Sequence, residues 1–202
     1  MGITFNNCLV FDECVQKVAE ARLKVSAISE ATELNLVVSE ETGKVFSVPA
    51  DDNSTDGPYE RIPIKFEVCC QEPVFRPRLI KDKIVNCGWV RGTLIIKNAK
   101  TGVTIECLPV SLVFQEVQLA CGVLPTDTIT EFVAEKEGEV TCVVFETLPD
   151  TAEEPVAIVV MKCIFRVRKI VTREEIVLPD PCTGGPVCPD PCEADTACKK
   201  HR

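Results

Sequence analysis

Strict alternation between apolar and polar residues is the feature that most constrains how this chain can fold. In residues 61–70 and 156–171 apolar side chains occupy every second position. Successive side chains of a β-strand point to opposite faces, so these segments predict strands with one buried face. Similar segments recur at short spacing without convincing amphipathic helices between them, over residues 16–27, 34–38, 44–48, 79–90, 92–97, 103–107, 110–119, 128–134, 140–147 and 174–178. We therefore expect an all-β fold, an antiparallel β-sandwich of about nine or ten strands.

Local signals refine this pattern. Residues 16–27 also fit helical spacing in part, so a helix is the alternative there. Turn residues predict two hairpins, one between 34–38 and 44–48, the other at Glu135–Gly138. Pro109 predicts a sheet edge or a break in a strand.

The alternation also assigns side chains to faces. Adjacent Cys69 and Cys70 point to opposite faces, so one can be a core residue while the other is available for chemistry. In residues 156–171 one face is apolar and the other basic. The apolar face comprises Ala157, Val159, Met161, Cys163, Phe165 and Val167, and the basic face Lys162, Arg166 and Arg168.

The chain divides into an N-terminal arm (1–16), a β-sandwich body (17–178) and a Cys-rich tail (179–202). The tail is a tandem repeat that starts Pro179-Asp180-Pro181-Cys182 and starts again Pro189-Asp190-Pro191-Cys192. Its prolines restrict φ and remove amide donors, and it has almost no apolar side chains. We expect an extended tail that cannot fold alone.

The N-terminal arm is apolar enough to pair with a sheet. It is either the first strand of its own body or a strand that adds to the open sheet edge of a neighbouring subunit. The candidate strand-exchange residues are Ile3, Phe5, Leu9 and Phe11.

Thirteen cysteines are too many for a typical cytosolic enzyme. The N-terminus shows no signal-peptide pattern, so we expect either intracellular metal-binding thiols or a protein that is oxidised after its reducing compartment opens. The odd number favours a cross-link between chains. The candidates for intersubunit disulfides are Cys8, Cys14, Cys69, Cys182, Cys188, Cys192 and Cys198.

The cysteines also allow roles that do not involve a second chain. The tail could fold back and staple its own domain, or bind zinc, although its spacing does not match a paired zinc motif. Cysteines in or beside strands can be small buried hydrophobic residues, an interpretation that applies to Cys87, Cys107, Cys121, Cys142 and Cys163. We expect no metal site and no cofactor.

The sequence argues against catalysis and against several partners. The only histidine, His201, stands next to the C-terminus, so no rigid Cys–His or Ser–His pair is available. A net charge of −9 disfavours nucleic acid, and no segment approaches the roughly 18 apolar residues of a membrane helix. Residues 52–57 imitate the start of a calcium loop, but Pro63 stands where the glutamate ligand belongs, which indicates an acidic surface loop.

Residues 84–90, leading into 93–96, and residues 165–175 carry a further pattern of alternating aliphatic side chains. In these segments the chain resembles the β-domain of spore-coat and spore-envelope proteins of endospore-forming bacteria. The tail is similar in character to Cys-rich coat, exosporium and spore-appendage subunits. The resemblance implies synthesis in the mother cell, oxidation when that cell lyses, and a place on the spore surface.

Together these observations predict a non-enzymatic, self-assembling subunit of a spore-surface layer or fibre, locked by intersubunit disulfides. Its partner would be the protein itself, with other spore-surface proteins as further partners. The alternatives are a non-catalytic adaptor that docks another coat protein and a thiol-rich metal-binding protein.

Overall fold

A computed structural model describes residues 4–48, 61–147 and 155–177, and in these ranges the chain is mostly antiparallel sheet. One helix, α1 (Val25–Thr32), follows the first strand. The strands are β1 (Thr4–Lys24), β2 (Leu36–Val38), β3 (Val45–Ser47), β4 (Ile62–Phe75), β5 (Arg78–Ile80), β6 (Lys83–Asn98), β7 (Thr104–Leu119), β8 (Thr128–Glu146) and β9 (Val156–Val177). The predicted all-β class is confirmed.

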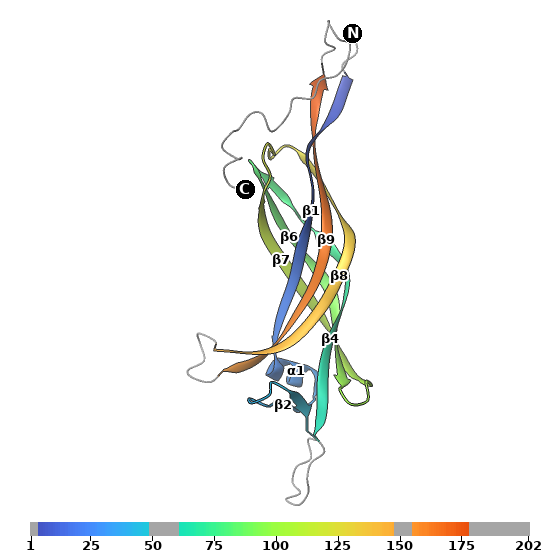
Figure 1. The fold of residues 1–202 in the computed structure, drawn as a ribbon, viewed down its shortest axis with the longest axis vertical. Coiled ribbons are helices and arrows are strands. Elements are labelled where there is room, and N and C mark those ends of the chain that lie inside the picture. The colour runs from blue at the N-terminus through green and yellow to red at the C-terminus, as the bar shows by residue number, and fades with distance from the viewer. Residues whose placement is uncertain (1–3, 49–60, 148–154, 178–202) are drawn as a thin grey trace, which may run out of the picture.

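The strands form one open sheet that folds over itself into a sandwich-like pair of layers. The strand order is β2-β3-β4-β6-β7-β1-β9-β8, with β5 beside β6. Figure 1 shows β1, β9 and β8 on one side and β4, β6 and β7 behind them. The layers join where β1 pairs with β7, at Glu20 and Val113.

The main hydrophobic core lies between the two layers. The side chains predicted to face inward on β9, from Val159 to Val167, are buried, whereas Arg166 and Arg168 are exposed. Unexposed residues of the opposite layer, Leu94 and Leu112 among them, pack against them. A smaller apolar cluster lies nearer the chain start of β1, around Val10, Ile84, Ala120, Val123 and Val171.

Two strand predictions are confirmed. The hairpin at 34–48 is present as β2 and β3. In β4, Cys70 is buried and Cys69 is exposed, as the alternation indicates.

The hairpin predicted at Glu135–Gly138 is wrong, because β8 is continuous through this segment. β9 is long enough to pair with both halves of β8. Two register shifts, between Val133 and Glu135 and between Lys136 and Gly138, accommodate the additional residues as β-bulges. Local turn chemistry is overridden by pairing with a long partner.

The interruptions expected at Arg91 and at residues 108–109 are also absent, since β6 and β7 pair without a break through Arg91 and Pro109. The single strand predicted over residues 79–90 is wrong, because a turn at Lys81 and Asp82 divides it into β5 and the start of β6, which pair with each other. Among the described strands β1 pairs with β7 only at Val113, so Pro109 has a ladder partner on β6 alone. The sheet-edge interpretation of Pro109 therefore fits, because a proline at an edge removes no hydrogen bond from a central ladder.

The strand expected over residues 16–27 ends at Lys24 and is followed by α1, which the strand pattern did not predict. Val25 and Ile28 of α1 are buried against the main core, and Glu33 ends the helix in the left-handed region. The helix therefore covers one end of the sandwich, where a strand would leave the core open.

Candidate functional site

The predicted cross-linking cysteines lie in different environments. Cys14 on β1 and Cys69 on β4 are exposed free thiols. Cys8 is buried, at 5% exposure, and like Cys121 it is not among the free thiols. The tail cysteines Cys182, Cys188, Cys192 and Cys198 lie outside the described residues.

Burial was predicted for several cysteines in or beside strands. Among the cysteines of β6 to β9, Cys163 is the one that is buried. Cys107 and Cys142 are exposed free thiols, and Cys87 is half-buried. Cys142 stands in an apolar run on β8, the last strand of its layer, so apolar neighbours in sequence do not bury it.

Cys69 and Cys107 share the outer face of the β4–β6–β7 layer. Cys69 is opposite Thr93 of β6, and Cys107 is opposite Ile95 of the same strand. β6 therefore separates the two thiols. With neighbouring strands about 4.8 Å apart and a two-residue offset along β6, they lie roughly 12 Å from each other, too far for a mutual disulfide. Each is free to react with a partner.

This outer surface, here named the thiol face, is largely apolar. Val113, Val117 and Leu119 of β7 are 63%, 57% and 59% exposed. The apolar and thiol-bearing members of the thiol face are Cys69, Val74, Trp89, Thr93, Ile95, Cys107, Pro109, Val113, Val117 and Leu119. The polar side chains of Arg91, Ser111 and Gln115 and the half-buried Cys87 lie among them on the same face. A surface of this kind on a chain of net charge −9 indicates a place of contact.

A carboxylate next to the thiol face, Glu67, is neutralised. Its oxygens pair with the ammonium groups of Lys97 and Lys65. The hydrogen bond from Lys97 and then that from Lys65 lower the pKa of Glu67 from 4.5 to about 2. This side of the sheet therefore presents little net negative charge.

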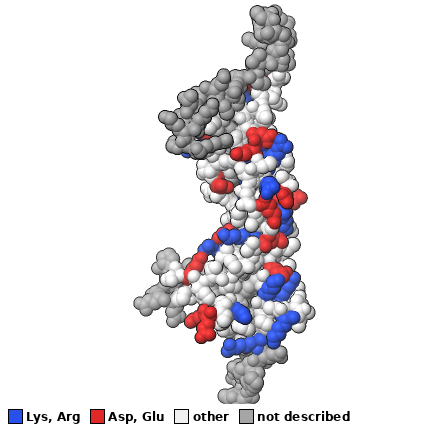
Figure 2. All heavy atoms as spheres, in the orientation of Figure 1, with Lys and Arg blue, Asp and Glu red and all other residues white. Residues whose placement is uncertain are grey.

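The outer face of the β1–β9–β8 layer is charged, and its side chains form a row of ion pairs. Arg168 of β9 pairs with Asp12 of β1 at 2.6 Å, and Lys162 pairs with Glu20 at 3.1 Å. Figure 2 shows basic and acidic side chains interleaved along one side of the molecule. The two outer faces of the sandwich thus differ in character, one charged and one apolar with thiols.

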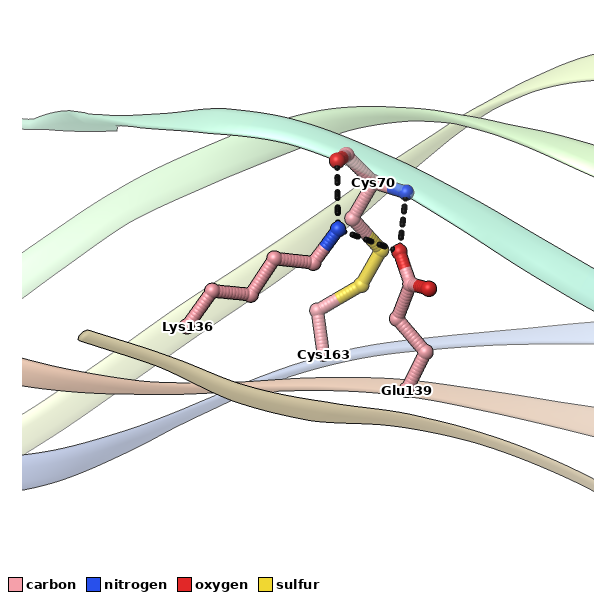
Figure 3. Close-up of a disulfide and its surroundings, with 4 residues drawn as sticks. All are labelled: Cys70, Lys136, Glu139 and Cys163. Carbon is pink, nitrogen blue, oxygen red and sulfur yellow. Dashed lines mark hydrogen bonds and ion pairs between the residues drawn. A yellow bond between two sulfur atoms is a disulfide. The ribbon is translucent and has the colours of Figure 1, made fainter.

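A disulfide between Cys70 of β4 and Cys163 of β9 joins the two layers (Figure 3). Their Cα atoms are 6.6 Å apart, within the usual range for such a bond. Both residues are buried in the main core.

Side chains from the bulged part of β8 form hydrogen bonds with the backbone of β4 beside this disulfide. Figure 3 shows Lys136 donating to the carbonyl oxygen of Cys70 at 3.0 Å, while the amide of Cys70 donates to Glu139 at 2.5 Å. Lys136 and Glu139 also pair with each other, at 2.7 Å. The β8 bulges therefore position two charged side chains over β4, which holds the open side of the sandwich together.

Cys70, Cys163 and Glu139 are also the metal-ligand group that the described residues bring together, with their ligand atoms within 4.8 Å of one another. A disulfide leaves neither sulfur as the thiolate that a metal needs. This group is therefore better described as a covalent link between layers.

A second site, which the strand pattern did not single out, is a polar layer between the two cores. It consists of Glu13, Lys17, Asn86, Gln118, Glu131 and Lys169, and three of its side chains, those of Lys17, Glu131 and Lys169, are 2%, 1% and 0% exposed. Charged groups are almost never buried in this way unless they are paired.

The polar layer is built from strands of both layers of the sandwich. Glu13, Lys169 and Glu131 lie in one row across β1, β9 and β8. The ammonium of Lys169 donates to Asn86 Oδ1 at 2.6 Å and to Gln118, and lies 3.8 Å from Glu131 Oε1. Most of the polar groups are satisfied within the layer.

Lys17 forms the shortest ion pair of the polar layer. Its ammonium lies 2.7 Å from Glu131 Oε1 and faces the rings of Phe75 and Phe114, whose centroids are 4.9 and 5.2 Å away. Lys17 also lines a pocket of about 380 Å³ between β1 and β7, beside Gln16, Val18, Phe114, Gln115 and Glu116. The pocket lies where these two strands diverge.

Burial changes the chemistry of Lys169. Loss of water, and then the charge of Lys17, lower the pKa of Lys169 from 10.5 to about 8, against the opposing effect of Glu131 and other carboxylates. The sequence held a signal for this residue, because the alternation that places Arg166 and Arg168 outward places Lys169 inward.

The candidate strand-exchange residues lie in β1 where they are described. β1 pairs with β9 from Thr4–Val177 to Lys24–Ile158, so residues 4–16 are the first strand of their own body in this structure. Leu9 is 56% exposed and Phe11 is half-buried. The backbone of Phe5 is opposite Ile176, and Ile3 lies outside the described residues.

The fold and these sites define an all-β, sandwich-like protein with free thiols on an apolar face. Of the described helices, none is long and apolar enough to cross a membrane. Comparison with protein-family models, with curated proteins and with solved structures finds no match for this chain.

Proposed function

We propose that this protein is a self-assembling structural subunit whose copies are locked together by intersubunit disulfides. The observation that carries the proposal is the presence of the exposed thiols Cys69 and Cys107 on an apolar sheet face. Free thiols can form disulfides between chains once the surroundings become oxidising. The spore surface is the setting that the sequence resemblance supports.

A second copy of the chain is the partner that charge and shape favour. Copies that each carry a net charge of −9 repel one another over most of their surface. On the thiol face the neighbouring carboxylate of Glu67 is neutralised by Lys65 and Lys97, so two such faces approach with the least repulsion. Contact there would bury apolar side chains and bring thiols of two chains together.

Cys14 on β1 and the tail cysteines are further cross-linking candidates in this proposal. Cys14 is exposed on the opposite layer, so it would join a subunit to a different neighbour from the one bound at the thiol face. Two bonding surfaces on each subunit are what an open polymer requires.

Electron microscopy and non-reducing gels of the purified protein, before and after reductant, test the proposal. We expect ordered polymers and a ladder of covalent oligomers that reductant abolishes. The double variant Cys69→Ser/Cys107→Ser should shorten the ladder, while Cys142→Ser, which removes an exposed thiol from β8, should leave it unchanged. A protein that stays monomeric after oxidation, or an equal loss in both variants, would contradict the proposal.

A further inference from the structure

Lys169, Asn86 and Glu131 bring three different chemical groups together inside the sandwich. Lys169 is on β9, Asn86 on β6 and Glu131 on β8, and all three side chains are inaccessible to water. Lys169 Nζ lies 2.6 Å from Asn86 Oδ1 and 3.8 Å from Glu131 Oε1. An amine, a carboxamide and a carboxylate are thus enclosed together.

We propose that Lys169 and Asn86 form an intramolecular isopeptide bond, with Glu131 as the proton-transfer group. The bond would join β9 to β6 and so link the two layers of the sandwich. It would be a second covalent link beside the Cys70–Cys163 disulfide, and one that reductants cannot break.

The approach of the reacting atoms favours this reaction. A carbonyl bond is about 1.2 Å long, so Asn86 Cγ lies at most about 3.8 Å from Lys169 Nζ, close to the separation of a near-attack conformer. Both groups are on strands that have a neighbour on each side, which fixes the backbone from which each side chain extends. Fixed proximity of this kind replaces a slow bimolecular step by a fast intramolecular one.

The unsatisfied atoms of the site match the atoms that the reaction uses. Among the buried side-chain atoms of the described residues, only Asn86 Nδ2 and Glu131 Oε2 have no hydrogen-bond partner. Asn86 Nδ2 is the leaving nitrogen, and Glu131 Oε2 is a carboxylate oxygen that is free to carry a proton. A buried polar atom without a partner is costly, and functional sites are where such atoms are retained.

The reaction balances without any other reactant. Lys169 gives a proton to Glu131, and the neutral amine attacks Asn86 Cγ to form a tetrahedral intermediate. Glu131 then delivers the proton to Nδ2 and takes the second proton from the attacking nitrogen. The Cγ–Nδ2 bond breaks as the new amide forms, and ammonia leaves with that second proton as ammonium, which returns Glu131 to its carboxylate form. No oxidant or reductant takes part.

Two neighbours assist these steps. Lys17 holds Glu131 in place through the 2.7 Å ion pair. The lowered pKa of Lys169 makes the neutral amine more available near neutral pH than it would be for an exposed lysine. A nucleophilic lysine needs this desolvation.

Intact mass spectrometry of the full-length protein, reduced and alkylated to remove disulfide effects, tests the proposal. We expect a mass lower by one ammonia molecule than that calculated for the sequence with all of its cysteines alkylated. A tryptic digest should contain residues 84–91 joined to residues 169–173, because trypsin cleaves after Arg168 but not after an acylated Lys169. Both readouts are independent of self-assembly.

Variants separate the roles of the three groups. Lys169→Met and Glu131→Gln should have the full mass of their sequences, and Asn86→Asp should lose water in place of ammonia. Lys162→Met, on the same strand but outside the polar layer, should still lose ammonia. A folded wild-type protein with the full sequence mass would overturn the proposal, and ammonia loss in Glu131→Gln would remove Glu131 from it.

Discussion

At the scale of single residues, charged side chains in this protein occupy positions that a strand pattern assigns to the core. Lys17 and Lys169 are almost completely buried, and each is held by acceptors from other strands. Burying a charge is costly unless it is paired and hydrogen-bonded, so the whole set of partners must be present at once. Such a layer specifies one register of the sandwich, because a slip of one residue would leave the ammonium groups unpaired.

Asp127 has a buried carboxylate that forms an ion pair with Arg173. Its carboxylate is 0% exposed and accepts both Nε and Nη2 of Arg173, at 2.7 and 2.9 Å, and the amide of Leu124 at 2.8 Å. Burial by itself would raise the pKa of Asp127, but the hydrogen bonds from Arg173 and Leu124 and the charge of Arg173 outweigh it, so the pKa lies below 3.8.

We expect Asp127→Asn to lower the free energy of unfolding by about 2–3 kcal/mol at neutral pH, because Arg173 loses its charged partner. The folded wild type holds its proton less tightly than the unfolded chain does. The stability that the ionised Asp127 contributes is therefore present above the unfolded pKa of 3.8. This stability is lost as the pH falls through the lower folded pKa.

Urea unfolding of both proteins at neutral pH and at several values below pH 4 measures this difference. Asp12→Asn is the control, since Asp12 and Arg168 form an ion pair on the exposed face and should contribute much less. A difference between wild type and Asp127→Asn that does not change with pH would contradict the assignment.

At the scale of elements, β6 is the strand on which the layer behind β1 and β9 depends. It pairs with β4, β5 and β7. Gly88 of β6 lies between Phe75 of β4 and Phe114 of β7 in one cross-strand row. The two rings meet edge to face with centroids 6.0 Å apart, over the position that a side chain at Gly88 would occupy.

We expect Gly88→Ala to lower the free energy of unfolding by about 1–3 kcal/mol, because overpacking forces the neighbours to move. A Cβ at Gly88 would lie under 3.0 Å from both the Val74 carbonyl oxygen and the Phe114 ring. The control is Gly138→Ala in β8, where a Cβ would meet nothing within 4 Å. Thermal and urea unfolding measure both, and equal effects would show that the space at Gly88 is not needed.

At the scale of the whole molecule, the two outer faces of the sandwich assign different tasks to the two layers. The β1–β9–β8 layer is covered with ion pairs such as Arg168–Asp12, which keeps that face in water. The β4–β6–β7 layer presents Val113 and its apolar neighbours together with free thiols. Assembly through the second face would bury apolar surface, whereas the first face would stay hydrated apart from the contact at Cys14.

We expect Val117→Glu to weaken noncovalent association of the reduced protein without lowering its stability, because Val117 is 57% exposed in the single chain and pairs with Val85 of β6, away from the junction with β1. Sedimentation equilibrium in reductant measures the association. Leu9→Glu is the matched control, since Leu9 is 56% exposed on β1, away from the thiol face. If the two variants associate equally well, the thiol face is not the contact surface.

Local alternation in the sequence determined the strand class of this protein and the inward and outward faces of its longest strands. The period of two in residues 61–70 and 156–171 needs no long-range information, because it reflects which face of a strand meets water. The same rule separates Cys69 from Cys70. It also places Lys169 on the inner face, although nothing in the sequence names its partners.

The tertiary structure alone decided strand continuity and the composition of both sites. β8 is unbroken at Glu135–Gly138 because a long neighbouring strand pairs with both of its halves, an interaction between residues far apart in the chain. The Cys70–Cys163 disulfide has the same origin, since 93 residues separate the two cysteines. Lys169 meets Asn86 and Glu131 only after two layers have closed on each other, so the chemistry of that site is a property of the packed molecule.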